Sequence, residues 1–213
     1  MTDLYIIGAG SVGGHIASNW EEYHMPFNLK GFLDDNPSKQ GINFCGYPVL
    51  GSVDFLKNHT ECAIVIGIAF PLIKLKIKRR LLEIGDFHFP SLVSPKSWIS
   101  KDVSIGDGSI IYPGTCINYG SNIGDFVVIN MNCSLGHNVH LGNFSSLAPG
   151  VNLAGHTFIG DSVEMGIGSS TRQSVKIFDN SVVGGQSMVI NDIPRNSIIA
   201  GVPAKSIKNI VYS

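Results

Sequence analysis

The sequence predicts a small Rossmann-like α/β domain over residues 1–90, followed by an all-β unit, a parallel β-helix with a C-terminal tail, over residues 91–213. Three observations predict this division. Strand-like and helix-like segments alternate before residue 90, a glycine-rich turn follows the first strand, and an apolar residue recurs at every sixth position from Val93 to Val189. Alternating strands and helices are typical of a parallel sheet, whereas a short fixed period is typical of a solenoid.

The first domain is predicted from hydrophobic runs bounded by turn residues. The expected strands are Leu4–Ile7, Leu29–Leu33 and Ala63–Ile66, and the expected helices are Val12–Tyr23, Val53–Asn58 and Leu72–Ile84. Strands separated by helices pair in parallel, so we expect a small sheet of three or four strands.

The repeat predicts the architecture of the second unit. Between Val93 and Val189 every sixth residue is apolar except Thr171, and a small or β-branched residue follows four positions after each. Three six-residue units close one triangular coil of about 18 residues, with the large apolar side chain inside. About five and a half coils follow without an insertion. Thr171 is the one polar residue at these repeat positions, and we expect a bulge in the unit from Thr171 to Lys176.

Composition excludes several classes of protein. Charged residues make up 15% of the chain and the formal net charge is −1, so no basic field favours a nucleic acid partner. The N-terminus lacks the basic region of a signal peptide, and the longest apolar stretch, Ala63 to Ile73, is too short to span a bilayer. We therefore expect a cytoplasmic protein that does not bind membranes.

The spacing of the four cysteines indicates thiols that pack within the protein, not a disulfide framework. They lie at positions 45, 62, 116 and 133, with no CxxC spacing. Buried thiols are therefore favoured over disulfides or a zinc site.

The turn from Gly8 to Gly13 has the pattern G-x-G-x-x-G between a strand and a helix. Such a turn lets backbone N–H groups approach a phosphate at the helix N-terminus. A dinucleotide domain needs about 150 residues, so a single nucleotide joined to a sugar fits this smaller domain better than NAD. Asp34 and Asp35 end the second strand, where they could contact the sugar or base; alternatively they cap the turn before Pro37.

One surface patch follows from stacking the coils. His137 occupies the outward third position of its unit, and a step of one coil places Gly155 beside it and His156 beside Asn138. A bare backbone next to a histidine suits an acyl group and its oxyanion. The alternative is that His137 is simply exposed. His140 lies on a different stretch of the unit, and we expect it to be an exposed side chain.

With these motifs in place, the chain resembles the bacterial N-acetyltransferases of UDP-, dTDP- or GDP-linked 4-amino-4,6-dideoxy sugars, which are relatives of the sialic acid O-acetyltransferase group. The resemblance rests on the turn Gly8-Ala9-Gly10, the strand end Phe32-Leu33-Asp34-Asp35, the pair Ile66-Gly67, the hexapeptides, and the tail Gly201-Val202-Pro203-Ala204-Lys205. It implies a left-handed β-helix.

The resemblance also implies residue roles. His137 matches the general base of that family, and Asn138 stands where the family has an acidic partner. An amide oxygen can orient the imidazole but lacks the charge of a carboxylate. Ser146 replaces a family histidine near the thioester, and Val12 replaces one that contacts the nucleotide sugar.

The implied ligands follow from the same resemblance. Acetyl-CoA, the co-substrate, would lie in a groove between the triangular β-helices, or prisms, of a homotrimer. Its thioester would lie near Gly155, its pantetheine beside Ile167 and Gly185, and its adenine toward Lys205. The nucleotide-linked amino sugar would contact Gly8, Gly10, Ser11, Val12, Asp34, Asp35 and Gly67. No metal is implied.

The predicted function is acetyl transfer from acetyl-CoA directly to the amino group of a nucleotide-linked sugar, in surface polysaccharide biosynthesis. Two alternatives on the same fold are a sialic acid-type O-acetyltransferase and a non-catalytic nucleotide-sugar-binding protein. A third, a metal-dependent hydratase, needs three converging imidazoles, and His137, His140 and His156 do not share one face.

Overall fold

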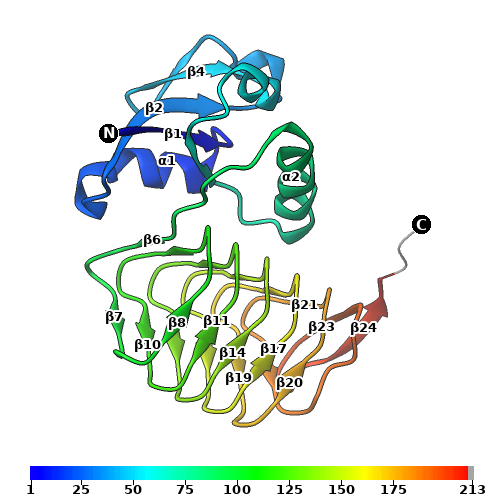
Figure 1. The fold of residues 1–213 in the computed structure, drawn as a ribbon. Helices are drawn as coiled ribbons and strands as arrows, with labels where there is room; N and C mark the ends of the chain where they lie inside the picture. The colour runs from blue at the N-terminus through cyan, green and yellow to red at the C-terminus, as the bar shows by residue number, and fades with distance from the viewer. Residues whose placement is uncertain (211–213) are drawn as a thin grey trace. The chain divides into compact units, whose positions relative to one another are not determined.

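The structure is a computed structural model that describes residues 1–210. Its internal contacts divide the chain into two compact units, Met1–Ser91 and a second that begins at Leu92. Each unit has its own sheet framework and its own buried core, which Figure 1 shows as an α/β layer and a stack of coils.

The first unit is built on a five-stranded sheet in the order β3-β4-β2-β1-β5. The strands are β1 (Thr2–Ile7), β2 (Phe27–Leu33), β3 (Asn43–Phe44), β4 (Tyr47–Gly51) and β5 (Ala63–Ile66). All pair in parallel except β3, which is antiparallel to β4. Leu4, Ile6, Phe32 and Ile64 are fully buried and form its centre.

The hairpin of β3 and β4 was not predicted from the sequence. Its turn consists of Cys45 and Gly46, both with positive φ, 49° and 85°. Hairpin turns of this kind are normally recognised by Asn-Gly or Asp-Gly, so the Cys-Gly pair gave no signal.

The helices of the first unit are α1 (Ser11–Ser18), α2 (Pro71–Ile84) and three 3₁₀ segments, η1 (Trp20–Tyr23), η2 (Pro37–Lys39) and η3 (Val53–Asn58). The prediction of one continuous helix over Val12–Tyr23 is wrong at Asn19. The Asn19 side-chain amide donates a hydrogen bond of 2.7 Å to the His15 carbonyl, and this competes with continuation of the α-helix.

The second unit is a parallel β-helix of three sheets. The eight-stranded sheet contains β6 (Leu92–Val93), β9 (Ile110–Ile111), β12 (Val128–Ile129), β15 (Ser146–Leu147), β18 (Glu164–Met165), β21 (Val182–Val183), β23 (Ser197–Ala200) and β24 (Lys205–Asn209). The six-stranded sheet contains β7 (Trp98–Ile99), β10 (Cys116–Ile117), β13 (Ser134–Leu135), β16 (Asn152–Leu153), β19 (Ser170–Thr171) and β22 (Met188–Val189). The five-stranded sheet contains β8 (Ser104–Ile105), β11 (Asn122–Ile123), β14 (His140–Leu141), β17 (Phe158–Ile159) and β20 (Lys176–Ile177).

The register confirms the predicted repeat. Ile117 pairs with Leu135 and Leu135 pairs with Leu153, so each coil stacks on the next in the expected step. These side chains point into the prism and are 0 to 3% exposed. The expected bulge after Thr171 is absent, because Ile159 still pairs with Ile177.

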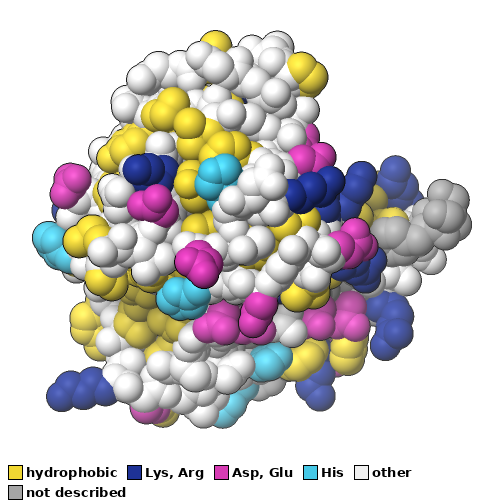
Figure 2. All heavy atoms as spheres, turned by 45° about the horizontal axis from the view of Figure 1, so that its top comes forward, with side chains coloured by type: hydrophobic (Ala, Val, Ile, Leu, Met, Phe, Trp, Pro, Cys, Tyr) yellow, Lys and Arg dark blue, Asp and Glu magenta, His cyan; other side chains and the backbone are white. Residues whose placement is uncertain are grey.

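The surface carries charges of both signs. On the face seen in Figure 2, acidic and basic side chains are interspersed with apolar ones, in keeping with the formal net charge of −1. Within residues 1–210, neither helix has the length and apolar character that crossing a membrane requires.

Candidate active site

The predicted patch lies at the corner where the six-stranded sheet turns into the five-stranded sheet. His137 and Asn138 connect β13 to β14, and Gly155 and His156 connect β16 to β17. The His156 N–H donates to the His137 carbonyl at 2.9 Å, which fixes the two corners one above the other. His137 is half-buried, whereas Asn138 and His156 are exposed.

The amide of Asn138 orients the His137 ring. Its Oδ1 lies 3.1 Å from Nδ1 of His137. An amide oxygen only accepts hydrogen bonds, so Nδ1 carries the proton and Nε2 keeps its lone pair. Asn138 has a φ of 58°, a left-handed conformation that asparagine tolerates better than most residues. The left-handed backbone of Asn138 thus places its side chain against Nδ1, and this contact leaves Nε2 of His137 on the other side of the ring.

Gly155 allows the His137 ring to pack directly against the backbone. A Cβ at this position would lie 2.7 Å from Nε2 of His137, closer than a carbon atom can approach without a shift. The N–H of Gly155 has no hydrogen-bond partner among residues 1–210. Tyr119 occupies the equivalent position two coils earlier, and its N–H donates to Asn118 Oδ1 at 2.8 Å. Ala154 precedes Gly155 and cannot cap it in this way.

Two aromatic rings enclose His137. Tyr119 stacks on it with ring centroids 5.4 Å apart and planes 11° apart, and His156 approaches edge-on at 4.8 Å. Tyr119 was not identified from the sequence, although it precedes His137 by one coil and the stacking rule could have found it. His140 instead stacks on Phe158 at 4.9 Å.

The other residues predicted to bind acetyl-CoA lie elsewhere on the prism. Ile167 and Gly185 are neighbours at the corner between the eight- and six-stranded sheets, where a Cβ on Gly185 would touch Ile167 at 3.1 Å. Ser146 belongs to β15 and is 8% exposed, and Lys205 begins β24. In a single chain the six-stranded sheet thus separates this corner from His137.

Of the residues predicted to bind the nucleotide sugar, Gly8, Asp34 and Asp35 line a cavity in the first unit, whereas Gly10, Ser11, Val12 and Gly67 are not among its lining residues. The cavity has a volume of about 310 Å³ and is lined by Gly8, Asp34, Asp35, Ile68 and other residues that include Arg80 of α2. Gly8, Asp34 and Ile68 follow the carboxyl ends of β1, β2 and β5, the edge at which open α/β sheets bind ligands.

The glycines of the turn have distinct roles. Gly8 has a φ of 103°, which other residues rarely adopt. A Cβ on Gly13 would run into the Gly8 carbonyl oxygen, so Gly13 allows α1 to lie close to the end of β1. A Cβ on Gly67 would lie 2.9 Å from the Gly13 Cα, so Gly67 allows α1 to lie close to the end of β5. A Cβ on Gly10 would meet nothing within 4 Å, so its α-carbon borders open space.

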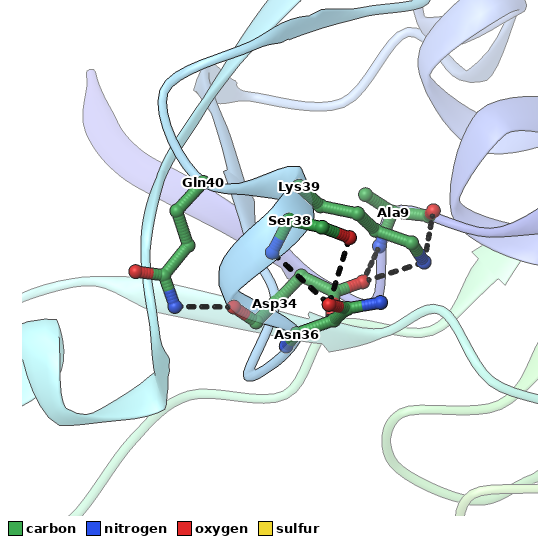
Figure 3. Close-up of polar contacts among 6 residues, drawn as sticks. All are labelled: Ala9, Asp34, Asn36, Ser38, Lys39 and Gln40. Carbon is green, nitrogen blue, oxygen red and sulfur yellow. Dashed lines mark hydrogen bonds and ion pairs between the residues drawn. The ribbon is translucent and has the colours of Figure 1, made fainter.

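The Asp34 side chain is hydrogen-bonded to the glycine turn at Ala9 and to neighbouring residues, as Figure 3 shows. Its Oδ2 accepts from the Ala9 N–H at 2.9 Å and from Lys39 Nζ at 3.1 Å, and Lys39 also donates to the Ala9 carbonyl. Oδ1 accepts from the Asn36 N–H at 2.9 Å. Partial burial raises the pKa of the Asp34 carboxyl, but these hydrogen bonds outweigh it and leave the pKa below its ordinary value. Both of its oxygens thus stabilise the turn.

Asp35 is also engaged by the protein. Its Oδ1 accepts from the Val53 N–H at 3.0 Å, and its Oδ2 pairs with Arg80 at 2.7 Å. Ser11 is exposed as the first residue of α1, whereas Val12 is only 5% exposed and its side chain packs in the core. The alternative prediction, that Asp34 and Asp35 cap the turn before Pro37, agrees with the bond from the Asn36 N–H to Asp34, whereas the contacts with Lys39 and Arg80 were not predicted.

Comparison with known proteins identifies the first unit and the overall fold. The PglD N-terminal domain family matches residues 3–81. The acetyltransferase domain of PglB from Neisseria gonorrhoeae has a TM-score of 0.87 and 26% identity, over 97% of this chain and all of that chain. PerB from Caulobacter crescentus, solved with CoA and GDP-perosamine, has a TM-score of 0.89 and 25% identity, over 98% of both chains. The predicted fold class, a small Rossmann-like domain followed by a left-handed β-helix, is therefore confirmed.

The curated relatives match a shorter stretch. A Saccharomyces cerevisiae protein named as an acetyltransferase is 44% identical over 61 residues, which is 29% of this chain and 31% of that protein. The alignment thus spans less than a third of that relative.

Proposed function

We propose that this chain, which belongs to the hexapeptide-repeat proteins with a PglD N-terminal domain, is an acetyl-CoA-dependent N-acetyltransferase of a nucleotide-linked 4-amino-4,6-dideoxy sugar. One observation carries the proposal: Nε2 of His137, the ring nitrogen that does not contact Asn138, lies beside the bare α-carbon of Gly155, whose N–H has no partner among residues 1–210. A base and a candidate oxyanion donor then lie at the same corner of the prism.

The arrangement suits direct acyl transfer. The sugar amine attacks the thioester carbonyl carbon while Nε2 of His137 takes the amine proton. The negative charge that develops on the carbonyl oxygen is stabilised by the Gly155 N–H. The C–S bond then breaks, and the proton passes from His137 to the leaving thiolate. No acyl group becomes attached to the protein, and the base contributes about 10² to 10⁴-fold to the rate.

The relatives support both substrates. PerB has been solved with CoA and GDP-perosamine, a nucleotide-linked amino sugar, and the PglB domain has been solved with acetyl coenzyme A. We assign the nucleotide of this chain's substrate to the cavity of the first unit. The N–H groups of Gly8 and Ala9 are used within the protein, so the first N–H groups of α1 are the ones we assign to the diphosphate.

We further propose that acetyl-CoA binds between the prisms of a homotrimer. The corner with Ile167 and Gly185 and the corner with His137 lie on opposite edges of the six-stranded sheet, so two copies of the chain would have to supply one complete site. Exposed apolar side chains on the prism, Trp98 at 58% and Ile167 at 57%, support an association through these edges. The mass of the protein in solution tests this.

We place the activity in the cytoplasm, where acetyl-CoA and nucleotide sugars are available, and in surface polysaccharide biosynthesis. The deciding experiment measures thiol release from acetyl-CoA against a panel of UDP-, dTDP- and GDP-linked 4-amino sugars. Matched hydroxyl-bearing sugars in the same panel test O-acetylation. Turnover with an amine acceptor is expected; turnover restricted to hydroxyl acceptors, or binding of the sugar without turnover, would overturn the proposal.

A further inference from the structure

The pairing of Ala154 with Thr171 departs from the hydrogen-bond pattern of the neighbouring coils. At this corner the regular backbone bond runs from an N–H to a carbonyl on the next coil, as in Gly136 to Leu153 and Arg172 to Val189, both 2.8 Å. The Ala154 N–H instead donates to the side-chain Oγ1 of Thr171 at 3.1 Å. The backbone pairing is reduced accordingly, because only Asn152 and Ser170 pair between β16 and β19.

The departure is produced by two hydroxyls in an apolar interior. Thr171 and Thr157 are 5% and 1% exposed, and their Oγ1 atoms lie 2.9 Å apart. On the preceding coil the corresponding residues are Leu153 and Val139, and on the following coil they are Val189 and Val175. Two threonines therefore face each other at this level, where aliphatic side chains fill the same two positions on the coils directly before and after.

The hydroxyls close a ring around one residue. Thr157 Oγ1 donates to the Ala154 carbonyl at 2.7 Å, which uses its only proton. The Thr171 hydroxyl must then donate to Thr157, and it accepts from the Ala154 N–H. Both backbone groups of Ala154 are thus held by side chains from inside the prism. The next residue along the chain is Gly155, whose α-carbon lies beside Nε2 of His137.

We propose that Thr171 and Thr157 are positioning residues, which set the Ala154–Gly155 segment so that the Gly155 N–H faces the acyl oxygen. They act through the backbone and touch neither substrate. An apolar residue at position 171 would allow the Ala154 N–H to return to the regular backbone carbonyl and would move the Gly155 peptide. This inference rests on the proposed function, because the acyl oxygen belongs to that reaction.

The test is Thr171→Val, which keeps the shape of the side chain and removes the hydroxyl. Thr157 keeps its bond to the Ala154 carbonyl in this variant. The Ala154 N–H loses the Thr171 hydroxyl as its acceptor and is expected to donate to the backbone carbonyl of residue 171 instead. We expect kcat to fall at least about 10-fold, because an oxyanion donor acts only when it is aimed at the developing charge. The KM for the nucleotide sugar and the melting temperature should stay the same, or the melting temperature should rise. Thr171→Ser, which restores an acceptor, should recover most of the rate.

The control is Thr115→Val. Thr115 is 0% exposed and donates to the Asn130 carbonyl at 3.0 Å, at a corner away from His137, so this variant should keep the normal kcat. If the unchanged protein is active, any one of three results would overturn the positioning role and leave the proposed function standing. These are a normal kcat in Thr171→Val, a fall in its kcat that is accompanied by a comparable fall in melting temperature, and an equal fall in kcat in Thr115→Val. Absence of turnover in the unchanged protein would instead refute the proposed function, and the positioning role with it.

Discussion

Oδ1 of Asn138 and Nδ1 of His137 lie 3.1 Å apart, in a corner that brings Nε2 of the same ring to the α-carbon of Gly155. An amide therefore holds the imidazole where the family resemblance implies a carboxylate. The amide fixes the tautomer, while the charge that would stabilise the protonated ring is absent.

This pair gives the first prediction. Asn138→Gly removes the acceptor but tolerates the φ of 58°, so kcat should fall about 2- to 10-fold, the effect of one neutral hydrogen bond. Asn138→Asp keeps the acceptor and adds a charge, so its kcat should equal or exceed that of the unchanged protein. Asn180→Gly, at another left-handed position with a φ of 57°, serves as the control for backbone effects. Steady-state rates at saturating substrates provide the measurement, and equal kcat in Asn138→Gly would argue against an orienting role.

The second prediction concerns the base itself. His137→Ala should lower kcat at least about 100-fold, because the amine proton then has no acceptor, while CoA binding by calorimetry stays normal. His140→Ala is the matched control, since His140 stacks on Phe158 and not on His137. Near-normal turnover by His137→Ala would rule out its role as base.

The prism was largely predictable because its period is short and its interior is apolar. A step of six residues places Leu135 and Leu153 inside, and a step of three units places Gly155 against His137. Such arithmetic needs no tertiary information, because every coil repeats the geometry of the one before it. The same arithmetic also marks Thr171 as unusual, but it cannot show that a hydroxyl replaces a backbone acceptor there.

The first unit was less predictable because its decisive contacts join residues without a common period. Lys39 reaches back to Ala9 and Asp34, and Arg80 of α2 pairs with Asp35. Their partners depend on how α1, α2 and the strand ends pack. The acidic pair lines the cavity, and the alternative that it caps the turn anticipated the Asn36 contact, whereas the contacts with Lys39 and Arg80 join residues too distant in the sequence to predict.

The third prediction uses two glycines of the turn. Gly10→Ala meets no atom within 4 Å, so the protein should fold with an unchanged melting temperature. If a phosphate lies there, the added methyl group should raise the KM for the nucleotide sugar at least about 10-fold without changing the KM for acetyl-CoA. Gly13→Ala should instead destabilise the first unit by about 1 to 3 kcal/mol, because its Cβ meets the Gly8 carbonyl oxygen. An unchanged sugar KM in Gly10→Ala would exclude the turn as the phosphate site.

The last prediction concerns the pH dependence of the first unit's stability. Burial raises the pKa of Asp34, but its hydrogen bonds lower it by more, so the folded pKa lies below the unfolded value of about 3.9. A depressed folded pKa contributes stability that is fully present above the unfolded pKa and is lost as the pH falls through the folded one. Asp34→Asn should therefore be less stable than the unchanged protein by about 1 to 3 kcal/mol near pH 7, the range for hydrogen bonds to a charged group.

The difference between the two proteins should persist down to about pH 5 and shrink below about pH 4, where the carboxyl of the unchanged protein takes up its proton. Urea unfolding followed at several pH values measures it, and Asp3→Asn is a suitable control, because Asp3 is an exposed acid whose contact with Lys30 spans 3.9 Å. A pH-independent difference would mean that Asp34 acts through packing rather than through its charge. In that case the contacts of Lys39 with Asp34 and with the Ala9 carbonyl would not be what stabilises the turn at Ala9. The variant Lys39→Met should then leave the KM for the nucleotide sugar unchanged.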